Sequence, residues 1–93
     1  MANPVMFVDQ AVTALTGAWQ NFVFVFAAKP FRATTMLIIN DESPSGNYID
    51  ISYDGTNIAF RLLPGENKLI NGPMNNIYLM GQAGGESYRM TAD

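Results

Sequence analysis

The chain has neither cysteine nor histidine among its 93 residues. Without cysteine, no disulfide can support a marginal core and no thiolate can hold a metal. Without histidine, the most common general base and the most common metal ligand are missing. Any catalysis would have to rest on carboxylates, lysines or tyrosines. We therefore expect a protein that is not an enzyme and that carries no cofactor.

Charge is also scarce. Charged residues make up 14% of the chain and hydrophobic residues 48%, whereas a typical soluble domain has about 25% charged residues. A domain of this size has a large surface relative to its volume, and long-lived protein interfaces are depleted of charge at their centres. We therefore expect the protein to bind copies of itself or other proteins. The net charge of −3 argues against a nucleic-acid partner, which requires a basic face.

Long apolar segments are missing too. The longest uninterrupted apolar run, Phe22 to Ala28, is far shorter than the roughly 20 residues that a membrane-spanning helix needs. The first residues show no basic region followed by an apolar run, so we expect no secretory signal and no membrane partner. We find no linker, charge block or tandem repeat. Residues 1–93 are therefore expected to form a single domain made in a cytoplasm.

From residue 36 onward, apolar and polar residues follow a pattern of strands and turns. Asp54-Gly55 lies between two alternating segments and predicts a tight hairpin. Pro64-Gly65 suits a type II turn, Gly84-Gly85 predicts another turn, and Asn71-Gly72-Pro73 predicts a break between strands. The strands predicted by this pattern cover residues 36–39, 48–53, 58–63, 66–70, 77–80 and 87–91.

The first third of the chain is less regular. Residues 5–8 are apolar on both faces, and residues 22–26 alternate phenylalanine with valine, which predicts two further strands. Val8, Val12, Leu15 and Trp19 have the spacing of a helical stripe, but threonines and a glycine between them disfavour a helix, so we prefer a strand followed by a loop.

About eight short strands with turns near every ten residues predict an all-β fold. The preferred architecture is a small antiparallel β-sandwich, and a small closed barrel is the alternative. Residues 1–20 are expected to form an extended N-terminal arm.

Two groups of oxygen-bearing side chains have the residue types of a chemical site. Asp41-Glu42 is a carboxylate pair of the kind used in acid–base catalysis, but adjacent residues in a loop rarely face one substrate, so we favour solvated loop acids. Asp50, Ser52 and Asp54 share one strand face, and their oxygens have a spacing that could hold Ca²⁺. We favour instead a polar strand face or a cross-strand ion pair between Asp50 and an arginine, either Arg61 or Arg89.

Aromatic residues could form a stacking surface for a sugar, because exposed aromatic rings contribute strongly to binding. The candidates are Trp19, Tyr48, Tyr53, Tyr78 and Tyr88. The competing interpretation is that Trp19 and Tyr53 cover the core while the other rings lie at its rim. Of the five, Tyr48, Tyr78 and Tyr88 are the rings that we expect to face a ligand.

The order of segments in the second half of the chain resembles small virion proteins of tailed bacteriophages. In those proteins an apolar strand ending in Asn-Asp precedes a strand ending in Asp-Gly, and a strand of the Ile-Tyr-Leu type precedes a small-residue turn and a Tyr-Arg strand. The matching segments here are Met36 to Asp41, Tyr48 to Gly55, Leu63 to Glu66, Ile77 to Gly81 and Gly84 to Met90. The resemblance covers roughly residues 36–91.

This resemblance implies a β-sandwich module in a virion, as a capsid-decoration, head-fibre or tail component. We therefore expect a non-enzymatic structural protein that assembles with itself and with capsid or tail proteins. The alternative is an adhesin-type module that binds a host surface glycan. Apolar residues of the N-terminal segment are the expected subunit contacts, namely Val5, Phe7, Val12, Leu15 and Trp19.

Overall fold

The computed structural model of the chain describes residues 7–10, 17–26 and 29–93. Within these residues the structure has ten β-strands and no helix. They are β1 (Phe7–Gln10), β2 (Gln20–Val23), β3 (Val25–Phe26), β4 (Lys29–Pro30), β5 (Ala33–Asn40), β6 (Ile49–Ser52), β7 (Phe60–Leu62), β8 (Asn67–Met74), β9 (Asn76–Gly81) and β10 (Tyr88–Ala92).

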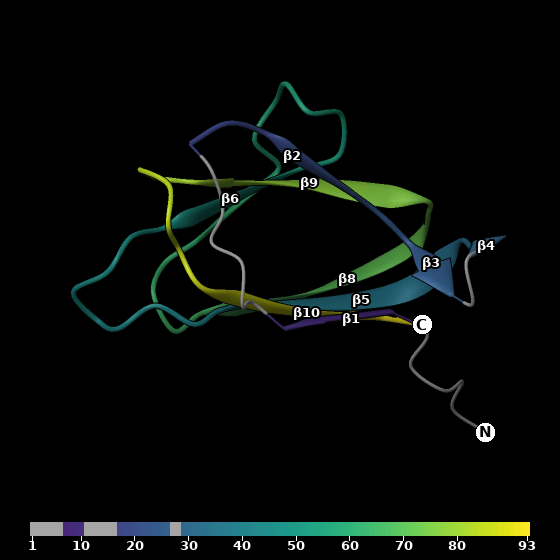
Figure 1. Cartoon of the computed structure of the whole chain (residues 1–93), viewed down its shortest axis with the longest axis horizontal. Helices are drawn as coiled ribbons and strands as arrows, with labels where there is room; N and C mark the ends of the chain where they lie inside the picture. The colour runs from purple at the N-terminus through teal and green to yellow at the C-terminus, as the bar shows by residue number, and fades with distance from the viewer. Residues whose placement is uncertain (1–6, 11–16, 27–28) are drawn as a thin grey trace.

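Eight of these strands form two four-stranded antiparallel sheets that pack face to face (Figure 1). Sheet A has the strand order β1-β10-β5-β8, and sheet B has the order β2-β9-β6-β7. Strands β3 and β4 form a short separate ladder at one end of the sandwich. The prediction of a small antiparallel β-sandwich is therefore confirmed.

Apolar side chains at every second strand position fill the space between the sheets. In sheet B, Ile49 and Ile51 of β6 and Leu79 of β9 are fully buried, as expected from the alternation of residues 48–53. In sheet A, Met36 and Ile38 of β5 face them. The other buried apolar residues of this core are Phe24, Ala33, Leu62, Ile70, Ile77, Tyr88, Met90 and Ala92.

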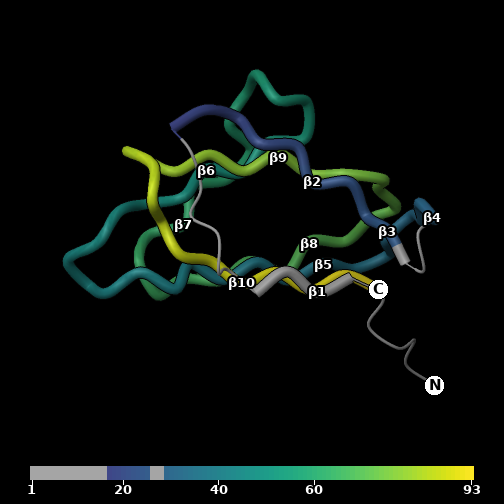
Figure 2. The backbone as a smooth tube through the Cα atoms, viewed as in Figure 1, coloured from purple at the N-terminus to yellow at the C-terminus, as the bar shows by residue number. Residues whose placement is uncertain are grey.

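Three connections meet at one end of the sandwich, opposite the C-terminus (Figure 2). They are the β5–β6 loop (residues 41–48), the β7–β8 turn (residues 63–66) and the β9–β10 loop (residues 82–87). The β6–β7 loop (residues 53–59) instead rises above sheet B (Figure 1).

The predicted turns are present, with one difference in length. Gly65 has a φ of 84°, and the Glu66 N–H donates to the Leu63 carbonyl at 2.9 Å, which confirms a turn at Pro64-Gly65. Gly84 and Gly85 both have a φ of 89°, as their turn requires. Gly55 also has a positive φ, but residues 53–59 separate β6 from β7, so this hairpin loop is longer than the tight turn we predicted.

The predicted break at residues 71–73 is wrong, because β8 continues through them to Met74. A Cβ on Gly72 would collide with the Ala33 carbonyl oxygen, so glycine permits the close approach of β5 at this point. Strand β8 lies at the edge of sheet A, where a proline is tolerated because no neighbouring strand needs its N–H. The pairing of β5 with β8 shifts register nearby, between Ala33 and Thr35.

The N-terminal third differs from its prediction in two ways. The segment 22–26 is not one strand, because β2 ends at Val23 and the Phe24 N–H donates to the Asn75 carbonyl at 3.0 Å. Within the expected arm of residues 1–20, β1 pairs with β10 of the same chain, with Phe7 opposite Ala92. Position 8 lies in this strand, in agreement with our prediction of a strand instead of a helix. Positions 12 and 15 lie outside the described residues.

Candidate functional site

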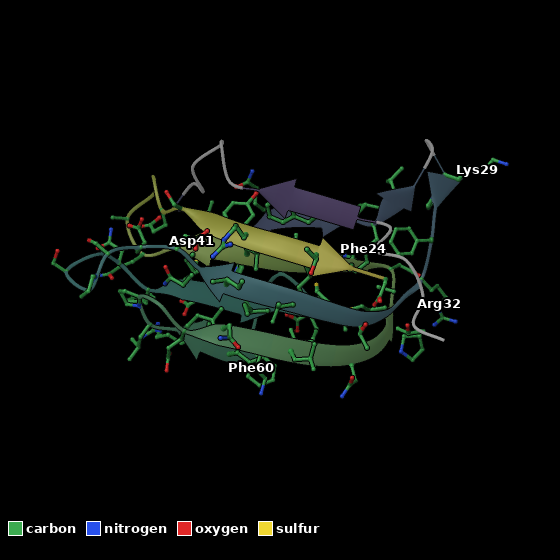
Figure 3. All side chains as sticks on the ribbon, turned by 90° about the horizontal axis from the view of Figure 1, so that it is seen from below. Phe24, Lys29, Arg32, Asp41 and Phe60 are labelled. Carbon is green, nitrogen blue, oxygen red and sulfur yellow. The ribbon has the colours of Figure 1, made fainter. Side chains whose placement is uncertain are left out.

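The outward-facing side of sheet A, which we call the sheet A face and which is turned toward the viewer in Figure 3, combines apolar side chains at its centre with polar ones around them. Leu37 of β5 lies opposite Leu69 of β8 and Thr91 of β10, and all three lie away from the core. The Leu69 side chain is 60% exposed. Two adjoining depressions on this face share Leu37 and Thr91 in their walls and have volumes of about 130 Å³ and about 100 Å³. Ile39 lines the second depression.

The two charged side chains described on this face, Arg89 and Asp93, both have partners. Arg89 donates to the Asp41 carboxylate at 2.7 Å, and this hydrogen bond raises the pKa of the arginine. Asp93 accepts a hydrogen bond from the Thr35 hydroxyl. Among its described side chains the face therefore carries one ion pair and one hydrogen-bonded carboxylate, that of Asp93, beside the apolar surface of Leu37 and Leu69.

The same contacts show what Asp41-Glu42 does. While Asp41 pairs with Arg89, Glu42 accepts a hydrogen bond from the Ser87 N–H at 3.1 Å. The two carboxylates thus tie the β5–β6 loop to the start of β10. This arrangement fits loop-stabilising acids rather than an acid–base pair that shares one substrate.

The outward-facing side of sheet B, the sheet B face, is polar and aromatic. Its buried charge is Asp50, which is 2% exposed and accepts hydrogen bonds from Arg61 at 2.8 and 3.2 Å. The guanidinium carbon of Arg61 lies 3.8 Å from the centre of the Tyr48 ring. The hydrogen bond to Asp50 raises the pKa of Arg61. The predicted cross-strand ion pair of Asp50 is therefore present, and its partner is Arg61.

The oxygens expected as Ca²⁺ ligands do not converge. Asp54 points into its own loop and accepts hydrogen bonds from the N–H groups of Asn57 and Thr56, both at 2.8 Å, and from the Ser52 hydroxyl at 2.9 Å. The hydrogen bonds from Asn57 and Thr56 hold the pKa of this carboxyl far below its usual value. Within the described part of the chain, no group of three acidic side chains is placed to hold a metal ion.

The structure brings together two of the three tyrosines expected to face a ligand. Tyr48 and Tyr78 are both partly exposed on the sheet B face. Tyr88 is 1% exposed and packs edge-on against Phe22 in the core, with ring centres 5.6 Å apart, so an external ligand has no access to it. Its neighbour Arg89 points outward. Because adjacent side chains of a strand point to opposite faces, an outward Arg89 indicates that Tyr88 points into the core.

Of the five residues expected as subunit contacts, the structure describes two. Phe7 lies in β1, the edge strand of sheet A, and Trp19 is partly buried directly before β2. Val5, Val12 and Leu15 lie outside the described residues.

A buried polar cluster at the loop end of the sandwich was not predicted. Glu86 is fully buried, and its Oε2 atom accepts hydrogen bonds from the Asn47 amide at 2.7 Å and the Ala83 N–H at 3.0 Å. Asn40 is also fully buried and donates to the Asn47 and Leu62 carbonyls, each at 3.0 Å. These contacts join loops far apart in sequence, so no local pattern reveals them.

Comparison of the chain with protein-family models, curated protein sequences and solved structures found no match. Across residues 7–10, 17–26 and 29–93 there is no helix of the length and apolar character needed to cross a membrane.

Proposed function

We propose that the chain is a non-enzymatic structural protein of a tailed-bacteriophage virion, a capsid-decoration, head-fibre or tail component that acts by oligomeric assembly. The observation that carries the assembly proposal is the sheet A face. It exposes Leu69 beside two depressions that Leu37 lines, and one of its two described charged side chains, Arg89, is ion-paired with Asp41. Exposed apolar surface with few charges is characteristic of the centre of a lasting interface.

A second copy of the chain is the proposed occupant of this face. Leu69 protrudes next to a depression of about 130 Å³ that it lines together with Leu37. Two copies related by a twofold axis can therefore each insert Leu69 into the depression of the other, as a self-complementary interface requires.

The size of the face also fits this occupant. Sheet A has four strands, and its longest strands, β5 and β8, have eight residues each, so the sheet is roughly 26 Å long and roughly 19 Å wide. A face of these dimensions offers on the order of 500 Å², which is close to the area that each partner buries in an interface at the lower end of the size range.

The assignment to a virion rests on the resemblance of residues 36–91 to small phage structural proteins. The segments that carry this resemblance form strands β5 to β10 and their connections, most of one sandwich. We propose that Trp19 adds to the contacts with capsid or tail proteins, together with other apolar residues of the N-terminal segment.

The assembly proposal is tested by comparing Leu69→Asp with Leu63→Asp. Both leucines are exposed, by 60% and 53%, but Leu63 lies in the β7–β8 turn, away from the sheet A face. Light scattering after size-exclusion chromatography should show a discrete oligomer for the wild type and for Leu63→Asp. For Leu69→Asp it should show a monomer with an unchanged thermal melting curve, because a buried unpaired charge strongly disfavours the interface.

A wild-type protein that stays monomeric at micromolar concentration contradicts this proposal, and so does equal dissociation by both variants. The virion assignment has a separate test. Mass spectrometry of purified particles of the encoding phage should detect the chain at a fixed ratio to the major capsid protein, and its absence from those particles would overturn the assignment.

A further inference from the structure

The sheet B face has a different character from the sheet A face, and it has no role in the proposed assembly. We infer that the sheet B face binds an uncharged linear oligosaccharide, with the ring of Tyr78 as the central stacking surface. The inference rests on the arrangement of aromatic and amide groups across β2, β9, β6 and β7. It does not depend on whether the chain is part of a virion.

Tyr78 lies in the middle of this face. It is directly opposite Asn21 of β2 on one side and Ser52 of β6 on the other. The β6–β7 loop stands beside it, since a Cβ on Gly55 would come within 2.9 Å of the Tyr78 ring. The ring is therefore supported by the loop while remaining partly exposed, as is needed for a ring that stacks on a sugar.

Two amide side chains next to Tyr78 are held in a fixed orientation. The Asn76 Nδ2 atom donates to the Asn21 Oδ1 atom at 2.7 Å. This bond leaves the Asn21 Nδ2 donor and the Asn76 Oδ1 acceptor without a protein partner among the described residues. A donor and an acceptor held side by side suit the adjacent hydroxyl groups of a sugar, each of which can both donate and accept.

The charges on the face favour a ligand without charge. Asp50 and Arg61 neutralise each other through two hydrogen bonds, so this pair adds no net charge to the face. A nucleotide, a sulfated glycan or a basic peptide would require a surplus of one sign. A neutral sugar requires aromatic surface and oriented hydrogen-bonding groups, and the face has both.

Tyr48 extends the surface beyond a single sugar unit. It faces Gln82, with hydrogen bonds in both directions between them, and Arg61 covers one side of its ring. Gln82 lies four residues after Tyr78, so the two tyrosines are about 14 Å apart along the strands. This separation suits a linear chain of several sugar units. Between the two tyrosines lies Met80 of β9, opposite the buried Asp50 of β6.

The test uses the chain of residues 1–93 and a panel of immobilised glycans that includes cellotetraose, maltotetraose, chitotetraose and sialyllactose. We expect binding to at least one uncharged member, with only a weak dependence on salt. In ¹H–¹⁵N NMR titrations with that tetrasaccharide, the largest shifts should fall on residues 21, 76, 78 and 80. Tyr78→Ala should weaken the affinity roughly tenfold or more, and Asn76→Ala should weaken it to a smaller extent.

Tyr53→Ala is the matched control. Tyr53 is 49% exposed, but its ring packs edge-on against the ring of Phe60. Phe60 is paired with Ile51, which faces the core, so Tyr53 and Phe60 do not belong to the sheet B face. This variant should bind like the wild type. The inference is wrong if no uncharged glycan binds at millimolar concentration, if sialyllactose binds more tightly than every neutral member, or if Tyr53→Ala weakens binding as much as Tyr78→Ala.

Discussion

Glu86 shows how a single buried carboxylate can hold together loops that are distant in sequence. Burial, the largest single influence, would raise the pKa of this group, but hydrogen bonds from the Ala83 N–H, the Asn47 amide and the backbone of Glu86 and Gly84 together outweigh burial and lower the pKa. The carboxylate fits against β9 only because Gly81 has no Cβ, which would occupy the position of the Glu86 Oε1 atom. The ionised side chain is thus a stabilising part of the fold at neutral pH.

We predict that stability depends on the ionisation of Glu86. Because its pKa is lower in the folded chain than its ordinary value of 4.5, its contribution is complete above that value and is lost as the pH falls through the folded pKa. Glu86→Gln should lower the free energy of unfolding at pH 7 by about 1–3 kcal/mol, the cost of replacing a buried charged acceptor. Urea denaturation at pH 7 and at acidic pH measures both effects.

The control for this prediction is Glu66→Gln. Glu66 is exposed and accepts a hydrogen bond from the Leu63 N–H at 2.7 Å. The control substitution therefore replaces the same chemical group, a carboxylate, outside the buried cluster. The acid-induced loss of stability should be smaller in Glu86→Gln than in Glu66→Gln. An equal loss in both variants would show that Glu86 does not contribute to the pH dependence.

At the residue scale, local patterns predicted some parts of the candidate site and missed others. Tyr48 and Tyr78 were expected to face a ligand, and strand alternation does place them outward. Tyr88 was also expected to face a ligand, but it is buried. Its charged neighbour Arg89 must face solvent, so strand alternation indicates that Tyr88 faces the core. The amide pair of Asn21 and Asn76 was not predicted, because the two residues are 55 positions apart in the sequence and only the pairing of β2 with β9 brings them together.

Strand β8 shows how close packing decides where an element ends. Its sequence Asn71-Gly72-Pro73 has the composition of a turn, yet the strand continues to Met74. The reason is non-local, because β5 approaches so closely that only glycine fits at position 72. Turns whose cause is local were predicted correctly. Pro64-Gly65, for example, needs only a proline with fixed φ and a glycine with positive φ.

We predict that Gly72→Ala is more destabilising than Gly65→Ala. At Gly65, which has a φ of 84°, an added Cβ meets nothing within 4 Å, so the cost is backbone strain alone, about 1–2 kcal/mol. At Gly72 the Cβ would meet the Ala33 carbonyl oxygen in the paired strand, and moving that backbone should cost about 3 kcal/mol or more. Thermal and urea denaturation of both variants give the comparison, and a reversed order would contradict the proposed packing of β8 on β5.

At the scale of the whole molecule, the core divides the surface into two faces with different chemistry. Sheet A presents leucine side chains, the Arg89–Asp41 ion pair and the Asp93 carboxylate outward, whereas sheet B presents tyrosines, amides and the Arg61–Asp50 ion pair. Between them, the fully buried side chains of Ile38, Ile51 and Leu79 fill the interior. The described outward side chains of the two faces share no contact across this interior, so substitutions on one face and on the other should act additively.

The last prediction is that assembly and oligosaccharide binding are independent. Leu69→Asp should abolish the oligomer and leave the affinity of a single site for the neutral tetrasaccharide unchanged. Tyr78→Ala should weaken that affinity and leave the oligomer intact, and the double variant should show both losses without further change, since distant sites in a rigid domain act additively. Light scattering and NMR titration on the four proteins provide the cycle. A several-fold change in sugar affinity on loss of the oligomer would show that the binding surface extends across the subunit contact, which the separation of the two faces does not allow.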